Sequence, residues 1–191
     1  MSRGRLFVVT GPSGVGKGTL IKELLERVPG LELSVSATTR APRKGERDGG
    51  DYHFLSEDEF QRRLAGNDFM EHAGYSGHHY GTLVSEVEPR LERGVGVVLE
   101  IEVQGARQVR ARMPDAVLVF VAPPSPQALR ERLEGRGTDT GEEIERRLRV
   151  AEEELRAQEE FRHVIVNDDV ERSAGELAAF VEVELGSTDA R

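Results

Sequence analysis

The sequence predicts an α/β fold in which a largely parallel sheet is flanked by helices, and three observations support this. Four short apolar runs rich in β-branched residues are spread along the chain. Segments with helical spacing of apolar residues lie between these runs. With 191 residues, of which 37% are hydrophobic and 32% charged, the chain is long enough to bury the core of one domain. Buried strands that alternate with helices form largely parallel sheets.

The first element is a buried strand at Leu6–Val9, because its β-branched and aromatic residues suit a sheet that is covered on both faces. A glycine-rich stretch follows it. Residues 19–27 then repeat apolar side chains at helical spacing until a proline-glycine pair ends the helix. Residues 33–55 are irregular in pattern, with a short strand expected near Leu33–Ser36.

The next helix begins at a capping box, the Ser-Glu-Asp-Glu sequence of residues 56–59, which apolar residues follow on one face. Further buried strands are predicted at residues 94–102, 115–124 and 163–169. A helix is expected in 142–158, with its glutamates and arginines on a solvated face, and the last helix from about Ser173 to Leu185. Residues 186–191 are predicted to form a loose tail.

Composition narrows the classes of function. The formal charge of −9 argues against nucleic-acid binding by the whole surface. The chain has no cysteine, which excludes disulfides, thiolate catalysis and cysteine-ligated zinc. The apolar stretch Leu6–Thr10 is too short for a signal segment, and no apolar run is long enough to span a bilayer. We expect a cytoplasmic protein without nucleic-acid or membrane partners, and make no prediction of its oligomeric state.

The glycine-rich stretch GPSGVGKGT, residues 11–19, predicts a phosphate-binding loop and hence a P-loop NTPase-like sheet. Its glycines let backbone N–H groups turn toward an anion, the helix adds its positive N-terminus, and Lys17 adds a full charge. The strict motif fails at Gly18, where a hydroxyl residue that touches Mg²⁺ is usual, and Thr19 follows one place late. The alternative is a glycine-rich turn with an incidental lysine.

A basic cluster in residues 36–54 suggests what the phosphate donor acts on. Four basic residues fall within eight positions of an otherwise acidic protein: Arg40, Arg43, Lys44 and Arg47. Forked guanidinium groups can hold a phosphate monoester through two bonds, and Tyr52 adds a hydroxyl donor. The alternative is a basic, solvated loop.

From about residue 5 to 185, the chain resembles the guanylate kinase family, which phosphorylates GMP from ATP. Eight motifs occur in the family's order: GPSGVGKGT, SVSATTRAPRKGE, DYHF, YSGHHYGT, LEIEVQG, APPS, LEGRGTD and VIVNDD. The resemblance implies one domain, phosphoryl transfer to GMP and dGMP, and a place in purine nucleotide metabolism. It also implies a division into a core of about residues 5–33, 95–134 and 147–185, a GMP-binding segment of about 34–90 and a lid of about 135–146.

The same resemblance implies a GMP site. Four residues would hold the GMP phosphate: Arg40, Arg43, Tyr52 and Tyr80. Glu71 would accept hydrogen bonds from guanine N1–H and the 2-amino group, with Ser36 and Thr82 near O6. Glu100 and Glu102 would lie near the waters of Mg²⁺ and the bound GMP. Two positions depart from the family pattern, since Thr82 is more often serine and Glu102 is usually aspartate.

On the donor side, the resemblance implies that ATP contacts the whole loop together with Arg132 and Asn167. The loop residues are Gly11, Pro12, Ser13, Gly14, Val15, Gly16, Lys17, Gly18 and Thr19. Charge on the transferring phosphoryl group would be offset by Lys17, Arg136 and Arg147, with Arg40 aligning the acceptor, so these four are the predicted catalytic residues. Mg²⁺ would arrive with ATP and have no direct protein ligand, with water-mediated contact near Glu100. The alternative for the arginines is a surface salt-bridge network.

Other classes of function remain open at this point. One is a guanylate-kinase-like scaffold that has lost catalysis and binds phosphorylated partners, although such domains typically degrade the phosphate loop. A second is a GTPase, but no lysine here follows an asparagine as in the guanine-reading motif of those proteins. A third is a kinase for another small phosphorylated acceptor. The adjacent His78 and His79 have no acidic or histidine partner at metal-ligand spacing, so a zinc enzyme is not expected.

Overall fold

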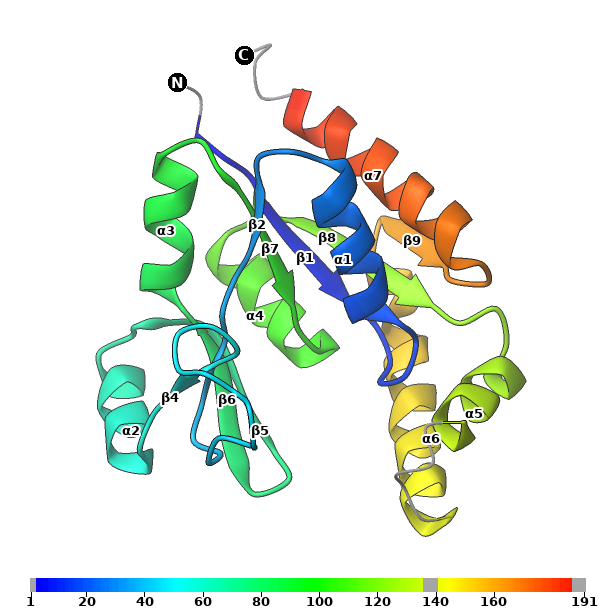
Figure 1. The fold of residues 1–191 in the computed structure, drawn as a ribbon, viewed down its shortest axis with the longest axis horizontal. Helices are drawn as coiled ribbons and strands as arrows, with labels where there is room; N and C mark the ends of the chain where they lie inside the picture. The colour runs from blue at the N-terminus through cyan, green and yellow to red at the C-terminus, as the bar shows by residue number, and fades with distance from the viewer. Residues whose placement is uncertain (1–2, 136–140, 187–191) are drawn as a thin grey trace.

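The computed structural model describes residues 3–135 and 141–186, and its centre is a five-stranded parallel sheet (Figure 1). The strand order is β2-β7-β1-β8-β9, and every neighbouring pair is parallel. The strands are β1 (Leu6–Thr10), β2 (Leu31–Leu33), β7 (Gly96–Glu100), β8 (Val117–Ala122) and β9 (His163–Val166). The predicted α/β class with a parallel sheet is therefore confirmed.

Helices cover both faces of this sheet, which explains why β1 is buried along its whole length. Strand alternation sends Phe7 and Val9 toward helices α1 (Lys17–Arg27) and α7 (Val170–Gly186). Leu6 and Val8 point to the other face, where α3 (Val84–Glu92) and α4 (Val103–Arg112) pack. Because both faces are apolar, the strand reads as a continuous hydrophobic run.

A second sheet lies within residues 37–83, which we call the insertion because it interrupts the main sheet between β2 and β7 (Figure 1). Its order is β4-β3-β6-β5, so β5 forms one edge. The strands are β3 (Ala37–Thr38), β4 (His53–Phe54), β5 (Phe69–Tyr75) and β6 (His78–Leu83). Helix α2 (Glu57–Ala65) begins where Ser56 accepts the Glu59 N–H, as the capping box predicts, and buries Phe60 against this sheet.

Two further helices pair beside the carboxyl ends of the main strands. Helix α5 (Pro126–Glu134) starts at Ser125, whose hydroxyl accepts the Ala128 N–H. Helix α6 (Gly141–Arg156) packs on α5 through their own apolar cluster and continues as a 3₁₀ turn, Ala157–Glu160. Within the described residues 3–135 and 141–186, no helix combines the length and apolarity needed to cross a membrane.

The structure corrects two element boundaries. The short strand expected near Leu33–Ser36 lies at Leu31–Leu33, where it pairs with the first residues of β7. The last helix begins at Val170 rather than near Ser173, because the carboxylate of Asp169 accepts the Arg172 N–H and caps the first turn. The helical spacing of apolar residues is clear only after this polar first turn, so a prediction from that spacing began the helix too late.

Candidate functional site

The glycine-rich loop joins β1 to α1 at the carboxyl end of the main sheet, where α/β proteins bind their ligands. Gly11 and Gly16 have φ values of +138° and +97°, which side chains other than glycine rarely adopt. A Cβ at Gly11 would lie 2.2 Å from the Val121 carbonyl oxygen, so the loop also passes too close to β8 for any side chain. Glycine is thus required by backbone geometry at both positions.

Lys17 is the first residue of α1, and its side chain folds back over the loop. Its Nζ donates to the carbonyl oxygens of Gly11, at 2.6 Å, and Pro12, at 3.2 Å. The ammonium group is therefore held at the loop that the sequence predicts to bind phosphates. A charge in this position can face an anion without further backbone movement.

Arg132 and Asn167 support the loop from behind. The Val15 carbonyl accepts from Arg132 Nη1, at 3.1 Å, and from Asn167 Nδ2, at 2.8 Å, while Arg132 Nη2 donates to the Asn167 carbonyl at 2.7 Å. Asn167 is 2% exposed, yet its Oδ1 has no hydrogen-bond partner in the described structure. Buried acceptors are rarely left unpaired, so this oxygen fits a ligand donor such as an exocyclic amine.

Helix α6 reaches the loop from the other side. Arg147 Nη2 donates to the Ser13 hydroxyl at 2.6 Å. Glu154 lies two turns further along α6, on the side of that helix that faces Ser13 of the loop. Burial and the nearby Glu102 carboxylate raise the pKa of Glu154 to about 7, although Lys17 opposes the shift.

Glu154 is not among the site residues that the sequence predicts. Its spacing of seven from Arg147 places both residues on one helical face, and this was the available signal. Arg136, the remaining lid arginine predicted to be catalytic, lies outside the described residues.

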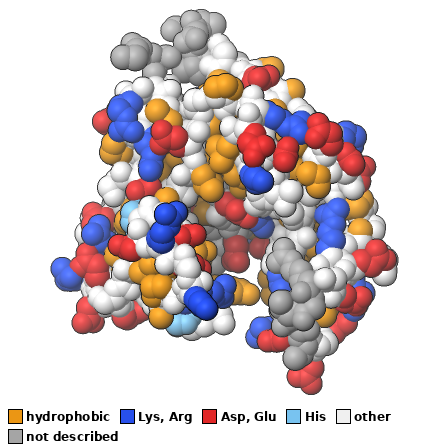
Figure 2. All heavy atoms as spheres, viewed as in Figure 1, with side chains coloured by type: hydrophobic (Ala, Val, Ile, Leu, Met, Phe, Trp, Pro, Cys, Tyr) orange, Lys and Arg blue, Asp and Glu red, His pale blue; other side chains and the backbone are white. Residues whose placement is uncertain are grey.

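Two cavities lie between the loop and the insertion, where Figure 2 shows the surface hollowed between the insertion and helices α5 and α6. The first has a volume of about 360 Å³ and is lined by Ser13 and Lys17 of the loop. The second, of about 210 Å³, reaches into the insertion, where Glu71 lines it. Both cavities share five lining residues: Ser36, Tyr52, Glu100, Ile101 and Glu102. They therefore adjoin, and together they lead from the loop to Glu71.

Glu71 is a buried carboxylate at the far end of this space, with 5% of its surface exposed. The Thr82 hydroxyl donates to its Oε1 at 2.7 Å from the paired position on β6. Burial raises the pKa of Glu71, while the hydrogen bonds from Thr82 act against that shift. Oε2 lies beside Gly105 on α4, where a Cβ would stand 2.6 Å away. Glu71 therefore faces the cavity and not the solvent.

Arg40 lies near the outer end of the insertion, on the face that carries two tyrosines. Its guanidinium donates to both carboxylate oxygens of Glu46, at 3.0 and 2.9 Å, and sits 5.3 Å from the centre of the Tyr52 ring. The rings of Tyr52 and Tyr80 meet edge to face with centres 6.2 Å apart. Three of the four predicted phosphate-binding side chains are thus gathered on one surface.

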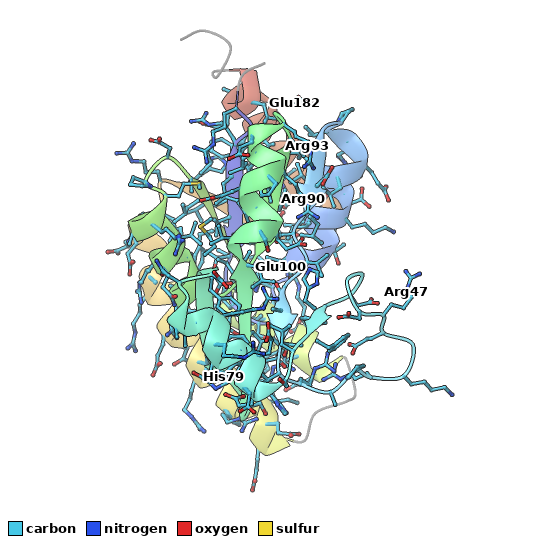
Figure 3. The ribbon with its side chains drawn as sticks, turned by 90° about the vertical axis from the view of Figure 1, so that its left-hand side faces the viewer. Arg47, His79, Arg90, Arg93, Glu100 and Glu182 are labelled. Carbon is cyan, nitrogen blue, oxygen red and sulfur yellow. The ribbon has the colours of Figure 1, made fainter. Side chains whose placement is uncertain are left out.

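The other predicted phosphate-binding residue, Arg43, is exposed on the loop after Arg40, and its backbone N–H donates to Glu46 at 2.6 Å. Arg47 projects from the same loop away from the body of the protein, as Figure 3 shows, and is not directed at the cavity. The basic cluster therefore divides, and Arg40 is the member that packs against the tyrosines.

Gly18, the departure from the strict loop motif, faces Glu100. A Cβ at this glycine would lie 3.5 Å from Glu100 Oε2. Both Glu100 and Glu102 are exposed at the end of β7, beside the cavity that Lys17 lines. Carboxylate oxygens are ligands suited to the waters of a hydrated Mg²⁺ ion.

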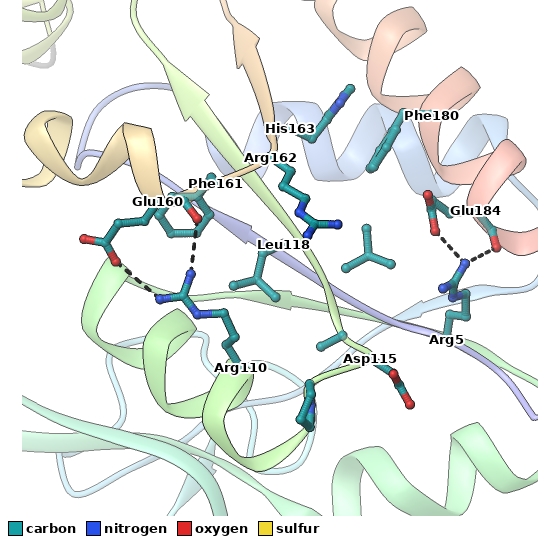
Figure 4. Close-up of a pocket in the computed structure, with 13 residues that line it drawn as sticks. Arg5, Arg110, Asp115, Leu118, Glu160, Phe161, Arg162, His163, Phe180 and Glu184 are labelled. Carbon is teal, nitrogen blue, oxygen red and sulfur yellow. Dashed lines mark hydrogen bonds and ion pairs between the residues drawn. The ribbon is translucent and has the colours of Figure 1, made fainter.

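A further hollow of about 660 Å³ lies at the opposite, amino end of the main strands, between β8, β9 and α7 (Figure 4). Two of the arginines that line it form ion pairs, Arg5 with Glu184 at 2.5 Å and Arg110 with Glu160 at 3.4 Å. It has no glycine loop and no carboxylate in an apolar pocket. Size alone therefore does not mark it as the site of chemistry.

The parallel sheet and the lysine-bearing glycine loop define a P-loop nucleotide-binding protein. The family model for guanylate kinase matches residues 3–184. The guanylate kinase of Rubrobacter xylanophilus is 55% identical over 177 residues, with 93% of both chains covered. That of Rhodococcus jostii is 52% identical over 181 residues, covering 94% of this chain and 87% of the relative.

Structure comparison agrees with sequence comparison. The crystal structure of guanylate kinase from Anaplasma phagocytophilum superposes with a TM-score of 0.77 at 34% identity, covering 96% of this chain and 87% of that one. The chain belongs to the guanylate kinase family.

Proposed function

We propose that the protein transfers the γ-phosphoryl group of ATP to GMP, giving ADP and GDP. The observation that carries this proposal is the buried Glu71 carboxylate, at the end of a cavity that adjoins the lysine-bearing loop. Guanine presents two adjacent donors, N1–H and the 2-amino group, which match the two oxygens of a carboxylate. Adenine presents an acceptor at N1 instead, so it would face Glu71 with a lone pair.

The donor site is formed by the glycine-rich loop and the residues that hold it. Backbone N–H groups of the loop bind the ATP phosphates, and Lys17 offsets charge on the β- and γ-phosphates. Arg147 and Arg136 offset charge on the transferring group, and Asn167 offers its unpaired Oδ1 to the adenine amino group. Arg132 keeps the loop in place through the Val15 carbonyl.

The acceptor site lies in the insertion and the end of β7. The GMP phosphate is held by Arg40, Arg43, Tyr52 and Tyr80. Glu71 binds the guanine edge, with Ser36 and Thr82 near O6 and the carboxylates of Glu100 and Glu102 beside the nucleotide. Since the attacking oxygen is already an anionic phosphate oxygen, the reaction needs alignment and charge neutralisation, and no protein nucleophile takes part.

Mg²⁺ enters with ATP, and when bound it neutralises charge on the phosphate oxygens. Glu100 and Glu102 would hold its waters, which fits two exposed carboxylates beside the cavity that Lys17 lines. Segment 34–90 acts as the GMP-binding unit and segment 135–146 as the lid, and their closure keeps water from the donor phosphate. The reaction takes place in the cytoplasm, as a step of purine nucleotide metabolism that accepts dGMP as well.

A nucleotide screen tests this function. With ATP as donor, ADP release should be fast with GMP and dGMP and close to background with AMP, CMP and UMP. A scaffold that only binds phosphorylated partners would release no ADP above background with any of them. A kinase for another acceptor would show its highest rate elsewhere in the set, and either result would overturn the proposal.

A further inference from the structure

Helix α4 lies outside the insertion, yet it packs along β5, the edge strand of the insertion's sheet. Strand edges carry backbone groups without a strand partner. Gln108 of α4 forms hydrogen bonds with both backbone groups of His72 on this edge strand, which have no strand partner. Its Oε1 accepts the His72 N–H at 3.1 Å, and its Nε2 donates to the His72 carbonyl at 2.8 Å. One amide side chain therefore bonds this residue as a neighbouring strand would.

His72 follows directly after Glu71, so this contact fixes the backbone that carries the guanine-binding carboxylate. On the other side, Glu71 and His72 pair with Thr82 and Gly81 of β6. Gly105 lies one helical turn before Gln108, and its lack of a side chain leaves room for Glu71 Oε2. One face of helix α4 thus contacts β5 twice, through Gly105 beside Glu71 and through Gln108 at His72.

We propose that Gln108 is a positioning residue for guanine selectivity, because it holds the Glu71 strand at the distance from α4 that guanine recognition requires. The inference rests on the proposed function. Gln108 is half-buried and touches the His72 backbone, whereas the cavity beside Glu71 is lined by other residues. It therefore acts through Glu71 and not through the nucleotide.

Selectivity is measured with GMP and inosine monophosphate as acceptors, because the second lacks the 2-amino group but keeps N1–H. The ratio of their kcat/KM values reports how well Glu71 meets both donors. A partly unfolded preparation lowers both values equally and leaves this ratio unchanged. Gln108→Ala should lower the ratio about tenfold, as expected when one charged hydrogen bond is misaligned, while the KM for ATP stays within about twofold.

Two further variants separate positioning from general packing. Arg107→Ala is the matched control, since Arg107 is the next residue of α4 but is exposed and pairs with Glu160 instead of β5. It should leave the ratio unchanged. Gln108→Glu keeps the acceptor for the His72 N–H but places a carboxylate oxygen against the His72 carbonyl. The two oxygens repel each other, so the ratio should be low at pH 8 in this variant as well.

An unchanged ratio in Gln108→Ala would show that the Gln108–His72 hydrogen bonds serve only packing, and it would overturn the proposal. So would a wild-type ratio in Gln108→Glu at pH 8. Failure of the proposed function looks different, because the wild-type protein itself would then fail to phosphorylate GMP preferentially. The wild-type screen therefore settles the function before the variants settle the role of Gln108.

Discussion

The guanidinium of Arg40 and the carboxylate of Glu46 form a two-bond ion pair on the surface where the acceptor phosphate is proposed to bind. A carboxylate and a phosphate offer a guanidinium the same paired oxygens. A phosphate monoester that takes the same two bonds therefore replaces Glu46 at Arg40. Glu46 also holds the Arg43 backbone N–H, so one acidic side chain organises both basic residues of this surface.

Arg40→Lys should raise the KM for GMP about tenfold, because an ammonium group cannot keep the two parallel bonds of a guanidinium. The KM for ATP should stay within about twofold. Arg47→Lys is the control, since Arg47 is exposed on the same loop and projects away from the cavity. Initial rates with each nucleotide varied in turn measure both constants. Equal GMP constants for the two variants would remove Arg40 from the phosphate site.

Lys17→Met should lower kcat by a factor on the order of 10²–10⁴, as for other preorganised charges that stabilise a transition state. GMP affinity should change little, because Glu71 and Arg40 lie elsewhere. Lys22→Met offers a matched control on the exposed face of the same helix, where the Lys22–Glu26 pair is 3.9 Å long. Turnover at saturating substrates is the measurement. If the Lys17 variant keeps more than about a third of wild-type kcat, the loop is not the donor site.

Glu71→Gln should reduce kcat/KM for GMP at least about tenfold, because one charged acceptor becomes a donor that faces a guanine donor. The KM for ATP should remain within about threefold. Glu57→Gln, on the exposed side of α2, changes the same functional group away from the cavity. Unchanged constants for GMP in the Glu71 variant would place guanine recognition elsewhere in the protein.

Glu154 makes stability depend on pH. Its folded-state pKa of about 7 lies above the ordinary value of 4.5, so the folded protein holds this proton more tightly than the unfolded chain. The contribution of Glu154 is therefore most favourable below pH 4.5 and is lost as the pH rises through 7. Full burial would make the shift worth about 3 kcal/mol, and partial contact with solvent reduces it to on the order of 1–2 kcal/mol.

Glu154→Gln should therefore raise the free energy of unfolding at pH 8 relative to wild type and change it little near pH 4.5. Urea unfolding at the two pH values measures the difference. Glu153→Gln is the matched control, because Glu153 is the exposed neighbour on α6. A stabilisation of the Glu154 variant that is the same at both pH values would contradict an effect of ionisation.

The main sheet was predictable because its strands are apolar on both faces, and runs such as Leu6–Val9 have few alternative structures. The insertion was harder to predict. Its strand β3 has only two residues. Strand β5 contains a charged residue and two small ones, and it is stabilised by contacts with β6 and α4 rather than by an alternating apolar pattern. Period-based reasoning has no signal for strands whose stability comes from distant partners.

Some residues of the candidate site could likewise be predicted from local sequence, and others could not. The glycine loop and Lys17 could be found from local sequence, because the loop's conformation requires glycine at fixed positions. Glu71 was assigned only through the family resemblance, as nothing local shows that this carboxylate is buried. Glu154 and Gln108 were missed because their surroundings, Glu102 and Lys17 for Glu154 and His72 for Gln108, come from segments far apart in the chain.

The insertion interrupts the main sheet as one continuous segment, entering after β2 and leaving at α3. Most residues that select the acceptor therefore lie in residues 37–83, apart from the phosphate loop, residues 11–19, that binds the donor. A lineage can change residues 37–83 and so acquire a new acceptor while its phosphate loop is inherited unaltered. Residues outside the insertion also contribute, since Ser36, Glu100 and Glu102 line the cavity beside Glu71 and Gly105 and Gln108 of α4 contact β5. Chimeras that exchange the insertion between relatives should therefore need α4 from the same parent.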